Sequence, residues 1–233
     1  FEKVFFKKSD MRKKFINGIF KKNIHEFGWY KAPQLNTYHV RGGITGGAEW
    51  TGASVDHKKH IMYVTSNNIA MESRLMLVSH KKNRAPIFRN EHKRLLENNL
   101  YPMNKPPWGT LNALNINSGK LLWKVPLGNY ESFKSEDKSL TGTENFGGTT
   151  VTRGGITITS GTLDKKIYFH NAENGDLLKS ILLPFIGSSP PTTYSVNGEQ
   201  FIIIHSTGGT SLKLGYGKLV ETGDALVALK LKN

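Results

Sequence analysis

Aromatic residues beside Gly-rich runs are the residues of this 233-residue chain whose types and spacing could do chemistry. Trp50 follows Gly46-Gly47, Trp108 precedes a glycine, and Phe146 precedes Gly147-Gly148. Gly-rich backbone lets a flat ligand approach closely, and an aromatic ring beside it offers a stacking surface. The pattern predicts a binding site for a flat organic ligand.

Other chemistries are excluded or weakly supported by the residue types. The chain has no Cys, which excludes Cys-ligated zinc, iron-sulfur clusters and covalently attached c-type haem. HExxH, Walker A and GxSxG patterns do not occur, which removes the common hydrolase and nucleotide-binding classes. His57 and His60 have the spacing of a metal pair, but a third ligand is missing and they fall in a predicted turn, so we interpret them as solvated.

An internal repeat indicates which elements position the aromatic residues. Residues 111–123 and 167–179 align at a constant offset of 56, with Asn, Gly, Leu and Leu coinciding, and residues 226–230 begin a third copy. Each copy is predicted to form a strand, a tight turn and a strand, because Asn117-Ser118-Gly119 and Glu173-Asn174-Gly175 supply residues that tolerate positive φ.

A second hairpin is predicted before each copy, so four antiparallel strands recur every 50 to 60 residues. That unit is typical of a β-propeller blade. The fold class is therefore all-β: an arc of about three four-stranded blades, with short helical insertions. A β-sandwich is the alternative, but it would not explain the repeat. The predicted blades span about residues 48–126, 145–184 and 189–232, with an insertion at 68–106 in the first and a helical or irregular lead-in at 1–40; residues 41–233 form the blade region.

The propeller interpretation also predicts where a ligand binds. Strand direction alternates, so the starts of the innermost strands and the joins between the second and third strands of each blade lie on one face. All the Gly-rich and aromatic runs fall at these joins, and ligand sites form where such loops converge.

Two basic segments carry most of the net charge of +14. Residues 1–25 hold eight Lys and Arg against two acids, and residues 81–105 hold seven against two. Both show helix-like apolar spacing, such as Leu95, Leu96 and Leu100. Neither mixes stacking aromatics with its basic residues, so we expect no nucleic acid and interpret both as solvated helix faces, with peripheral membrane contact as the alternative.

Four runs in order resemble the C-terminal part of pyrroloquinoline-quinone (PQQ)-dependent dehydrogenases, closest to the quinoprotein glucose dehydrogenase branch. The resemblance covers residues 28–232, and its motifs are at 46–53, 106–114, 141–148 and 223–228. It implies an eight-bladed propeller that holds PQQ and calcium or magnesium, oxidises sugars or alcohols and passes electrons to a quinone or cytochrome.

By resemblance, Gly47, Trp50, Phe146, Gly147 and Asp164 contact the cofactor, and Trp108 lines the substrate entrance. The catalytic residues and metal ligands are implied to lie upstream of Phe1, so the catalytic base is unknown and no metal ligand is expected in this chain. Ile44 replaces an Asn of many relatives, and Lys179 replaces the structural tryptophan that Trp123 keeps.

These observations predict the C-terminal segment of a PQQ-dependent dehydrogenase that oxidises an aldose or polyol. Its partners would be the sugar substrate, a quinone or cytochrome acceptor and the rest of the propeller. The resemblance implies a periplasmic or inner-membrane-associated protein. A non-catalytic propeller that serves as a scaffold is the alternative, and we expect the segment alone to be inactive.

Overall fold

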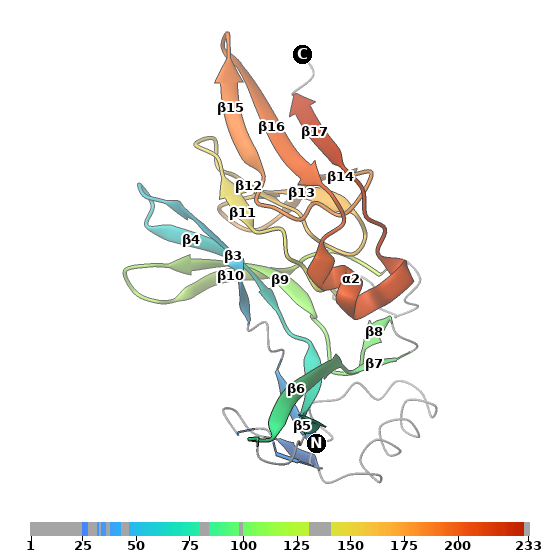
Figure 1. The fold of residues 1–233 in the computed structure, drawn as a ribbon. Coiled ribbons are helices and arrows are strands. Elements are labelled where there is room, and N and C mark those ends of the chain that lie inside the picture. Colours follow the sequence, from blue (N-terminus) through green and yellow to red (C-terminus); the bar gives the residue numbers. More distant parts are fainter. Residues whose placement is uncertain are drawn as a thin grey trace. The chain divides into compact units, whose positions relative to one another are not determined.

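The chain divides into two compact units in a computed structural model (Figure 1). The model describes residues 25–27, 32, 34–35, 38–42, 47–79, 84–97, 100–130 and 141–230. The first unit, here the insert unit, comprises Phe1–Gly46 and Asn68–Lys105. The second, here the blade unit, comprises Gly47–Asn67 and Pro106–Asn233.

The first sheet of the blade unit has four antiparallel strands in the order β10-β9-β4-β3. Its strands are β3 (Ala48–Asp56), β4 (Ile61–Asn67), β9 (Gly109–Asn115) and β10 (Leu121–Pro126). The β-branched and aromatic residues of β4 suit a pleated sheet, and its alternate residues Tyr63, Thr65 and Asn67 are buried.

The next two sheets follow along the chain (Figure 1). The second sheet is β11 (Thr149–Val151), β12 (Ile156–Thr159), β13 (Lys166–Asn171) and β14 (Leu177–Leu182), paired in that order. The third has three described strands, β15 (Thr192–Val196), β16 (Glu199–Ser206) and β17 (Ala225–Lys230). Successive antiparallel sheets of this kind confirm the predicted all-β blades.

The repeated hairpins are present as predicted. β9 and β10 form one copy and β13 and β14 form the other, with Gly119 and Gly175 in their turns at φ 68° and 81°. Each copy carries a register shift where its second strand begins, so a β-bulge recurs at the same place in the repeat.

Polar and aromatic contacts join the first sheet to the second. The Tyr63 hydroxyl and the Trp123 indole N–H both donate to the carbonyl of Ala172, at 3.0 and 3.2 Å. Ser54 contacts Thr149 across the same junction, with 2.8 Å between the two hydroxyl oxygens. Trp123 is therefore a structural residue, as the sequence predicts.

A buried aliphatic cluster joins the second sheet to the third. Ile158, Ile167 and Leu183 pack against Ile204 of β16, and each of the four side chains is at most 3% exposed. The blade unit is thus held together by one apolar and one mixed junction between successive sheets.

The insert unit is also built from strands. Its main sheet has the order β1-β2-β5-β6, and a two-stranded ladder stands apart from it. The strands are β1 (His25–Phe27), β2 (Tyr38–Gly42), β5 (Ala70–Ser79), β6 (Ile87–Arg94), β7 (Leu96–Glu97) and β8 (Tyr101–Pro102).

The prediction of a helix within residues 81–105 is wrong. β6 pairs with β5 over Ile87–Arg94, and Leu96 pairs with Pro102 in the short ladder. Much of the helical lead-in expected at 1–40 lies outside the described residues, and its described part includes β1 and the start of β2. The described α-helix is α2 (Thr210–Tyr216), which precedes the 3-10 turn η2 (Gly217–Leu219) between β16 and β17.

Candidate functional site

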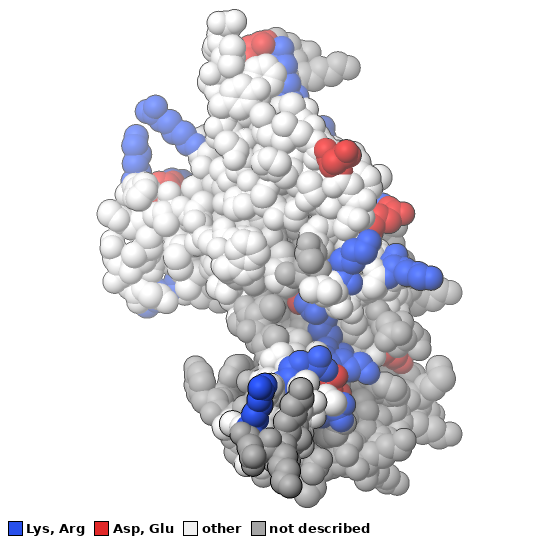
Figure 2. Space-filling model, in the orientation of Figure 1, with Lys and Arg blue, Asp and Glu red and all other residues white. Residues whose placement is uncertain are grey.

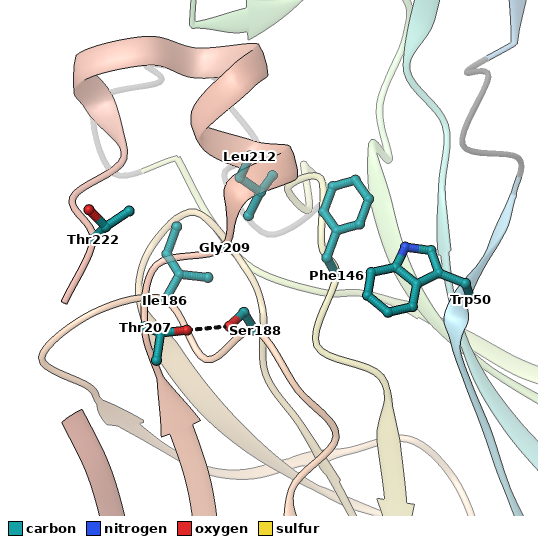
Figure 3. A pocket seen from close by; sticks show the side chains of 8 residues that line it. All are labelled: Trp50, Phe146, Ile186, Ser188, Thr207, Gly209, Leu212 and Thr222. Atoms are coloured by element: carbon teal, nitrogen blue, oxygen red, sulfur yellow. Dashed lines mark hydrogen bonds between the residues drawn. The ribbon is translucent and has the colours of Figure 1, made fainter. Parts of the chain in front are cut away.

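A pocket of about 400 Å³ lies in the blade unit where connections between strands converge (Figure 3). It is lined by the start of β3, the segment before β11, the connection from β14 to β15 and the connection from β16 to β17. The pocket therefore lies at joins where the sequence predicted a ligand site, and the binding of a ligand there stays a prediction. The lining residues are Trp50, Phe146, Ile186, Ser188, Thr207, Gly209, Leu212 and Thr222.

Trp50 lies on the pocket side of a bulged part of β3. The pairing of β3 with β4 shifts register between Ala48 and Ala53, and Gly52 adopts φ 85°, which a glycine allows at low cost. The Trp50 side chain is 81% exposed, and Figure 3 shows its indole beside Phe146. A large aromatic surface is therefore open to a ligand.

Phe146 is held rigidly next to it. Its side chain is 4% exposed, and its backbone N–H donates to Gly161 at 3.2 Å. A Cβ atom on Gly147 would stand 2.2 Å from the carbonyl oxygen of Ser160, so only glycine permits this backbone approach. Gly147 therefore positions Phe146 through packing within the chain. Gly47 is exposed, and a Cβ atom there would meet no atom within 4 Å.

The opposite wall of the pocket combines hydroxyls with aliphatic side chains. The Ser188 and Thr207 hydroxyl oxygens are 2.7 Å apart and hydrogen-bonded (Figure 3). Ile186 and Leu212 are each 1% exposed and supply an apolar floor. The sequence analysis missed Ile186 and Ser188. A signal for them was present before the innermost strand of the third predicted blade, in the loop-forming run Gly187-Ser188-Ser189-Pro190-Pro191.

Asp164 does not line this pocket. One carboxylate oxygen accepts the backbone N–H of Asn129 at 2.8 Å and the hydroxyl of Tyr168, and the other accepts the Thr162 hydroxyl at 2.6 Å. These bonds tie the β12–β13 connection to the segment after β10. The structure thus gives Asp164 a structural role, and its predicted cofactor contact has no support from the pocket.

Trp108 is not at an entrance in this structure. Its side chain has no exposed surface, it packs edge-on against Tyr130 with ring centres 5.4 Å apart, and its backbone N–H donates to Thr141 at 2.6 Å. Trp108 of the motif at 106–114 therefore packs in the interior of the blade unit. The sequence could not distinguish this packing role from an exposed one.

A pair of buried amides fixes the segment that carries Phe146. The Asn67 side chain donates to the Asn145 carbonyl at 2.8 Å and accepts the Asn145 backbone N–H at 2.9 Å. Both residues are nearly or completely buried. These hydrogen bonds join the end of β4 to the residue before Phe146, and no sequence pattern predicted them.

One buried histidine in the second sheet stays neutral near pH 7. His170 is 3% exposed and stacks on Tyr168, with ring centres 6.0 Å apart. Burial lowers the pKa of His170 from 6.5 to about 4, because the charged imidazolium would lose its hydration. His57 and His60 are exposed in the β3–β4 turn, and no cluster of three or more His, Asp or Glu occurs within the described ranges.

The pocket fits a flat ligand that bears hydrogen-bond acceptors. PQQ has this chemistry, as a planar fused-ring quinone with carboxylate groups. The exposed Trp50 indole offers a stacking surface, and Ser188, Thr207 and Thr222 offer hydroxyl donors. Among the residues that the structure describes, no charged side chain lines the pocket, so a cation that pairs with the carboxylates would come from outside this set.

The sheets define a segment of a β-propeller, and Trp50 and Phe146 line a pocket in it. The chain belongs to the PQQ family: residues 5–202 match the β-propeller domain of glucose/ethanol/alcohol dehydrogenases.

Individual relatives agree with this assignment. The chain is 25% identical over 231 residues to quinoprotein glucose dehydrogenase A of Acinetobacter calcoaceticus, covering 90% of this chain and 28% of that protein. It is 32% identical over 111 residues to the glycerol dehydrogenase large subunit of Gluconobacter oxydans, covering 45% of this chain and 15% of that protein. The chain therefore spans less than a third of the length of these relatives.

A solved structure supports the fold alone. The quinohemoprotein alcohol dehydrogenase of Comamonas testosteroni superposes with a TM-score of 0.56 at 18% identity, over 82% of this chain and 27% of that one. Among the residues placed by the structure, no helix is both long and apolar enough to cross a membrane.

Proposed function

We propose that this chain is part of a PQQ-dependent dehydrogenase that oxidises an aldose or polyol and passes the electrons to a quinone or another acceptor. The observation that carries the proposal is the pocket in which Trp50 and Phe146 meet, in a chain that belongs to the PQQ propeller family. The printed names of its relatives, a glucose dehydrogenase and a glycerol dehydrogenase, favour sugars and polyols as substrates.

The residues of this chain would bind and orient the cofactor. Bound PQQ supplies the two-electron acceptor that oxidation of a hydroxyl requires. Trp50 presents its indole face to the ring system, and Phe146 restricts where the ring can lie. The Ser188 and Thr207 hydroxyls bond to each other, so one of the two keeps its hydrogen for an acceptor atom at the ligand's edge. The buried Ile186 and Leu212 exclude water beneath the ligand.

The remaining machinery is assigned to other parts of the protein. The resemblance places the catalytic base and the ligands of a calcium or magnesium ion before Phe1. A divalent cation would polarise the quinone, in the manner of a Lewis acid. We also propose a periplasmic or inner-membrane-associated location, which rests on the resemblance alone.

A non-catalytic scaffold is the second candidate. The structural roles of Asp164 and Trp108 favour it, because two residues expected to serve the chemistry pack or bond within the fold instead. The two functions differ in whether the pocket retains a cofactor.

Reconstitution of the full-length protein with PQQ and calcium distinguishes the two. We expect dye-linked oxidation of aldoses or polyols that depends on added PQQ, and quinone absorbance that stays with the protein after gel filtration. A protein that shows neither the oxidation nor the retained absorbance is a scaffold.

A further inference from the structure

A cationic and apolar surface lies at the turn end of the first sheet. We call it the basic tip; it comprises Lys58 and Lys59 of the β3–β4 turn and Ile116, Lys120, Leu121 and Leu122 of the β9–β10 hairpin. All six side chains are exposed. Figure 2 shows Lys and Arg side chains projecting from hairpin tips at the left of the view, over a mostly uncharged surface.

The two turns of the basic tip are physically joined. The backbone N–H of Ile116 donates to the carbonyl of His60 at 2.9 Å, and Ile61 pairs with Asn115 in the ladder. The turn that carries Lys58 and Lys59 therefore adjoins the hairpin that carries the aliphatic side chains. His57 and His60 flank the lysines and are also exposed.

The carboxylate nearest to the lysines is already engaged by the backbone. Asp56 accepts the backbone N–H groups of Lys58 and Lys59 on one oxygen, at 2.9 and 3.1 Å, which fixes the shape of the turn. Within the described residues, Lys58, Lys59 and Lys120 form no ion pair. Their charges are directed to solvent.

The aliphatic side chains of the basic tip expose about half of their surface to solvent. Ile116 is 49% exposed, Leu121 54% and Leu122 48%. The β-bulge between Leu121 and Trp123 interrupts the ladder with β9 at this point.

The second copy of the repeat serves as an internal comparison. Leu177 and Leu178 occupy the same repeat positions as Leu121 and Leu122 and are 56% and 55% exposed. Their turn carries Asp176 where the first hairpin has Lys120, and Glu173 where it has Asn117. Exposed leucine pairs are thus common to both hairpins, and an exposed Lys179 follows the second pair. The basic tip differs because three lysines in two adjoining turns accompany its pair.

We propose that the basic tip docks on the surface of an anionic phospholipid bilayer. Lysines beside exposed leucines match a membrane interface, where cations meet phosphate groups and aliphatic side chains enter the acyl boundary. An acidic protein partner would satisfy the lysines and leave the leucines in water. This surface differs from the basic segments 1–25 and 81–105.

The basic tip is remote from the pocket. Trp50 and Asp56 lie six residues apart on β3, a separation of about 20 Å along an extended strand. Docking would leave the pocket on the side away from the bilayer, so the inference stands whether or not the proposed dehydrogenase function is correct.

A single labelled cysteine tests insertion directly, because these 233 residues contain no Cys. Any Cys elsewhere in the full-length protein would first be replaced by Ser. We would label Leu121→Cys and, as the matched control, Leu178→Cys with an environment-sensitive fluorophore in the full-length protein. Vesicles of phosphatidylcholine with a minority of phosphatidylglycerol should shift the emission of the Leu121→Cys protein to the blue and leave that of the control unchanged. Equal responses from the two proteins would overturn the proposal.

Vesicle flotation separates the contributions of charge and apolar surface. Lys58→Glu/Lys59→Glu should weaken binding to anionic vesicles about tenfold or more, and Leu121→Ser/Leu122→Ser should weaken it as well. The controls are Lys179→Glu/Lys218→Glu, which changes net charge equally outside the tip, and Leu177→Ser/Leu178→Ser.

Three results would refute the bilayer as the partner. Equal losses from Lys179→Glu/Lys218→Glu would indicate non-specific attraction of a basic protein. Unchanged binding of Leu121→Ser/Leu122→Ser would exclude insertion. Tighter binding to polyglutamate than to anionic vesicles would indicate an acidic protein partner.

Discussion

Two tryptophans of the first sheet have opposite environments. Trp50 is 81% exposed beside the pocket, whereas Trp123 is half-buried and bonded to the next sheet through the Ala172 carbonyl. A side chain that contributes little buried area contributes little to folding, so its size needs another explanation. For Trp50 we propose ligand contact as that explanation.

Replacement of these tryptophans separates the two roles. We expect Trp50→Ala to change the stability of the apo-protein by less than about 0.5 kcal/mol, as for other surface substitutions. Trp123→Ala should cost about 3 kcal/mol or more, because it removes a packed ring and leaves a cavity. Thermal unfolding of both variants measures this, and a large fall in Tm for Trp50→Ala would contradict the assignment of Trp50 to the pocket.

His170 predicts how stability depends on pH. Its pKa is about 4 in the folded protein and 6.5 when unfolded, so between these values the unfolded chain binds more protons. Stability is therefore fully present above pH 6.5 and falls as the pH falls toward 4. Between pH 7 and 5 the loss should be about 2 kcal/mol, since each pKa unit is worth about 1.4 kcal/mol.

His170→Gln removes this titration while keeping a polar side chain. Urea unfolding at pH 7 and 5 should show that the wild-type protein loses about 2 kcal/mol more than the variant over this interval. Parallel losses in the two proteins would show that His170 is hydrated in the folded state.

At the scale of elements, backbone contact between two segments shapes the fold near the site. A Cβ atom on Gly109 would lie 1.7 Å from the Thr143 carbonyl oxygen, and one on Gly142 would lie 2.0 Å from the Gly109 oxygen. The start of β9 and the Gly-rich run before Phe146 therefore touch through their main chains, and no side chain fits between them.

Gly109→Ala should disrupt this contact. We expect a loss of about 3 kcal/mol or more, because backbone atoms on both sides would have to move. Gly47→Ala is the control, since its Cβ would meet nothing within 4 Å, and it should change stability by less than about 0.5 kcal/mol. Chemical denaturation compares the two, and an equally stable Gly109→Ala protein would refute the close approach.

The hairpins could be predicted from sequence because local and long-range signals agree. In both repeats an Asn or Ser before Gly marks the turn, and β-branched or aromatic residues form the flanking strands. The segment around Leu95, Leu96 and Leu100 was misassigned because a short apolar run fits either period. Pairing of Leu96 with Pro102 in the β7–β8 ladder decided in favour of strand. Helix α2 was missed because it is short and contains Gly215.

The site could be predicted only in part. Trp50 and Phe146 both line one pocket. The repeat made this predictable, because it places the starts of their strands on the same face. Contact with a cofactor remains a prediction for both. The sequence could not show that Asp164 bonds to Asn129, which is 35 residues away along the chain. It could not show that Trp108 packs on Tyr130 either, since these two residues lie in separate segments.

At the scale of the whole molecule, the blades separate two surfaces. The pocket lies at one end of the strands of the first sheet and the basic tip at the other. Strand alternation produces this arrangement, because turns and joins fall on opposite faces. Ligand binding and membrane docking can therefore be altered independently by substitution.

The 233-residue chain alone should not oxidise sugars or polyols. We expect this because the resemblance implies that the catalytic base and the metal ligands lie outside these 233 residues, which would bind one side of the cofactor without completing the chemistry. Dye-linked assays with PQQ and calcium on the purified chain check this. Turnover by that chain would refute the division of roles.

Direct titration of the full-length apo-protein with PQQ tests the central claim. We predict that the protein retains PQQ and that Trp50→Ala weakens binding by about 1 to 3 kcal/mol, by analogy with bases that stack on aromatic side chains. Lys179→Glu, on the exposed face of β14, should leave the affinity unchanged. If folded Trp50→Ala protein binds PQQ as tightly as the wild type, the pocket between Trp50 and Phe146 is not the cofactor site.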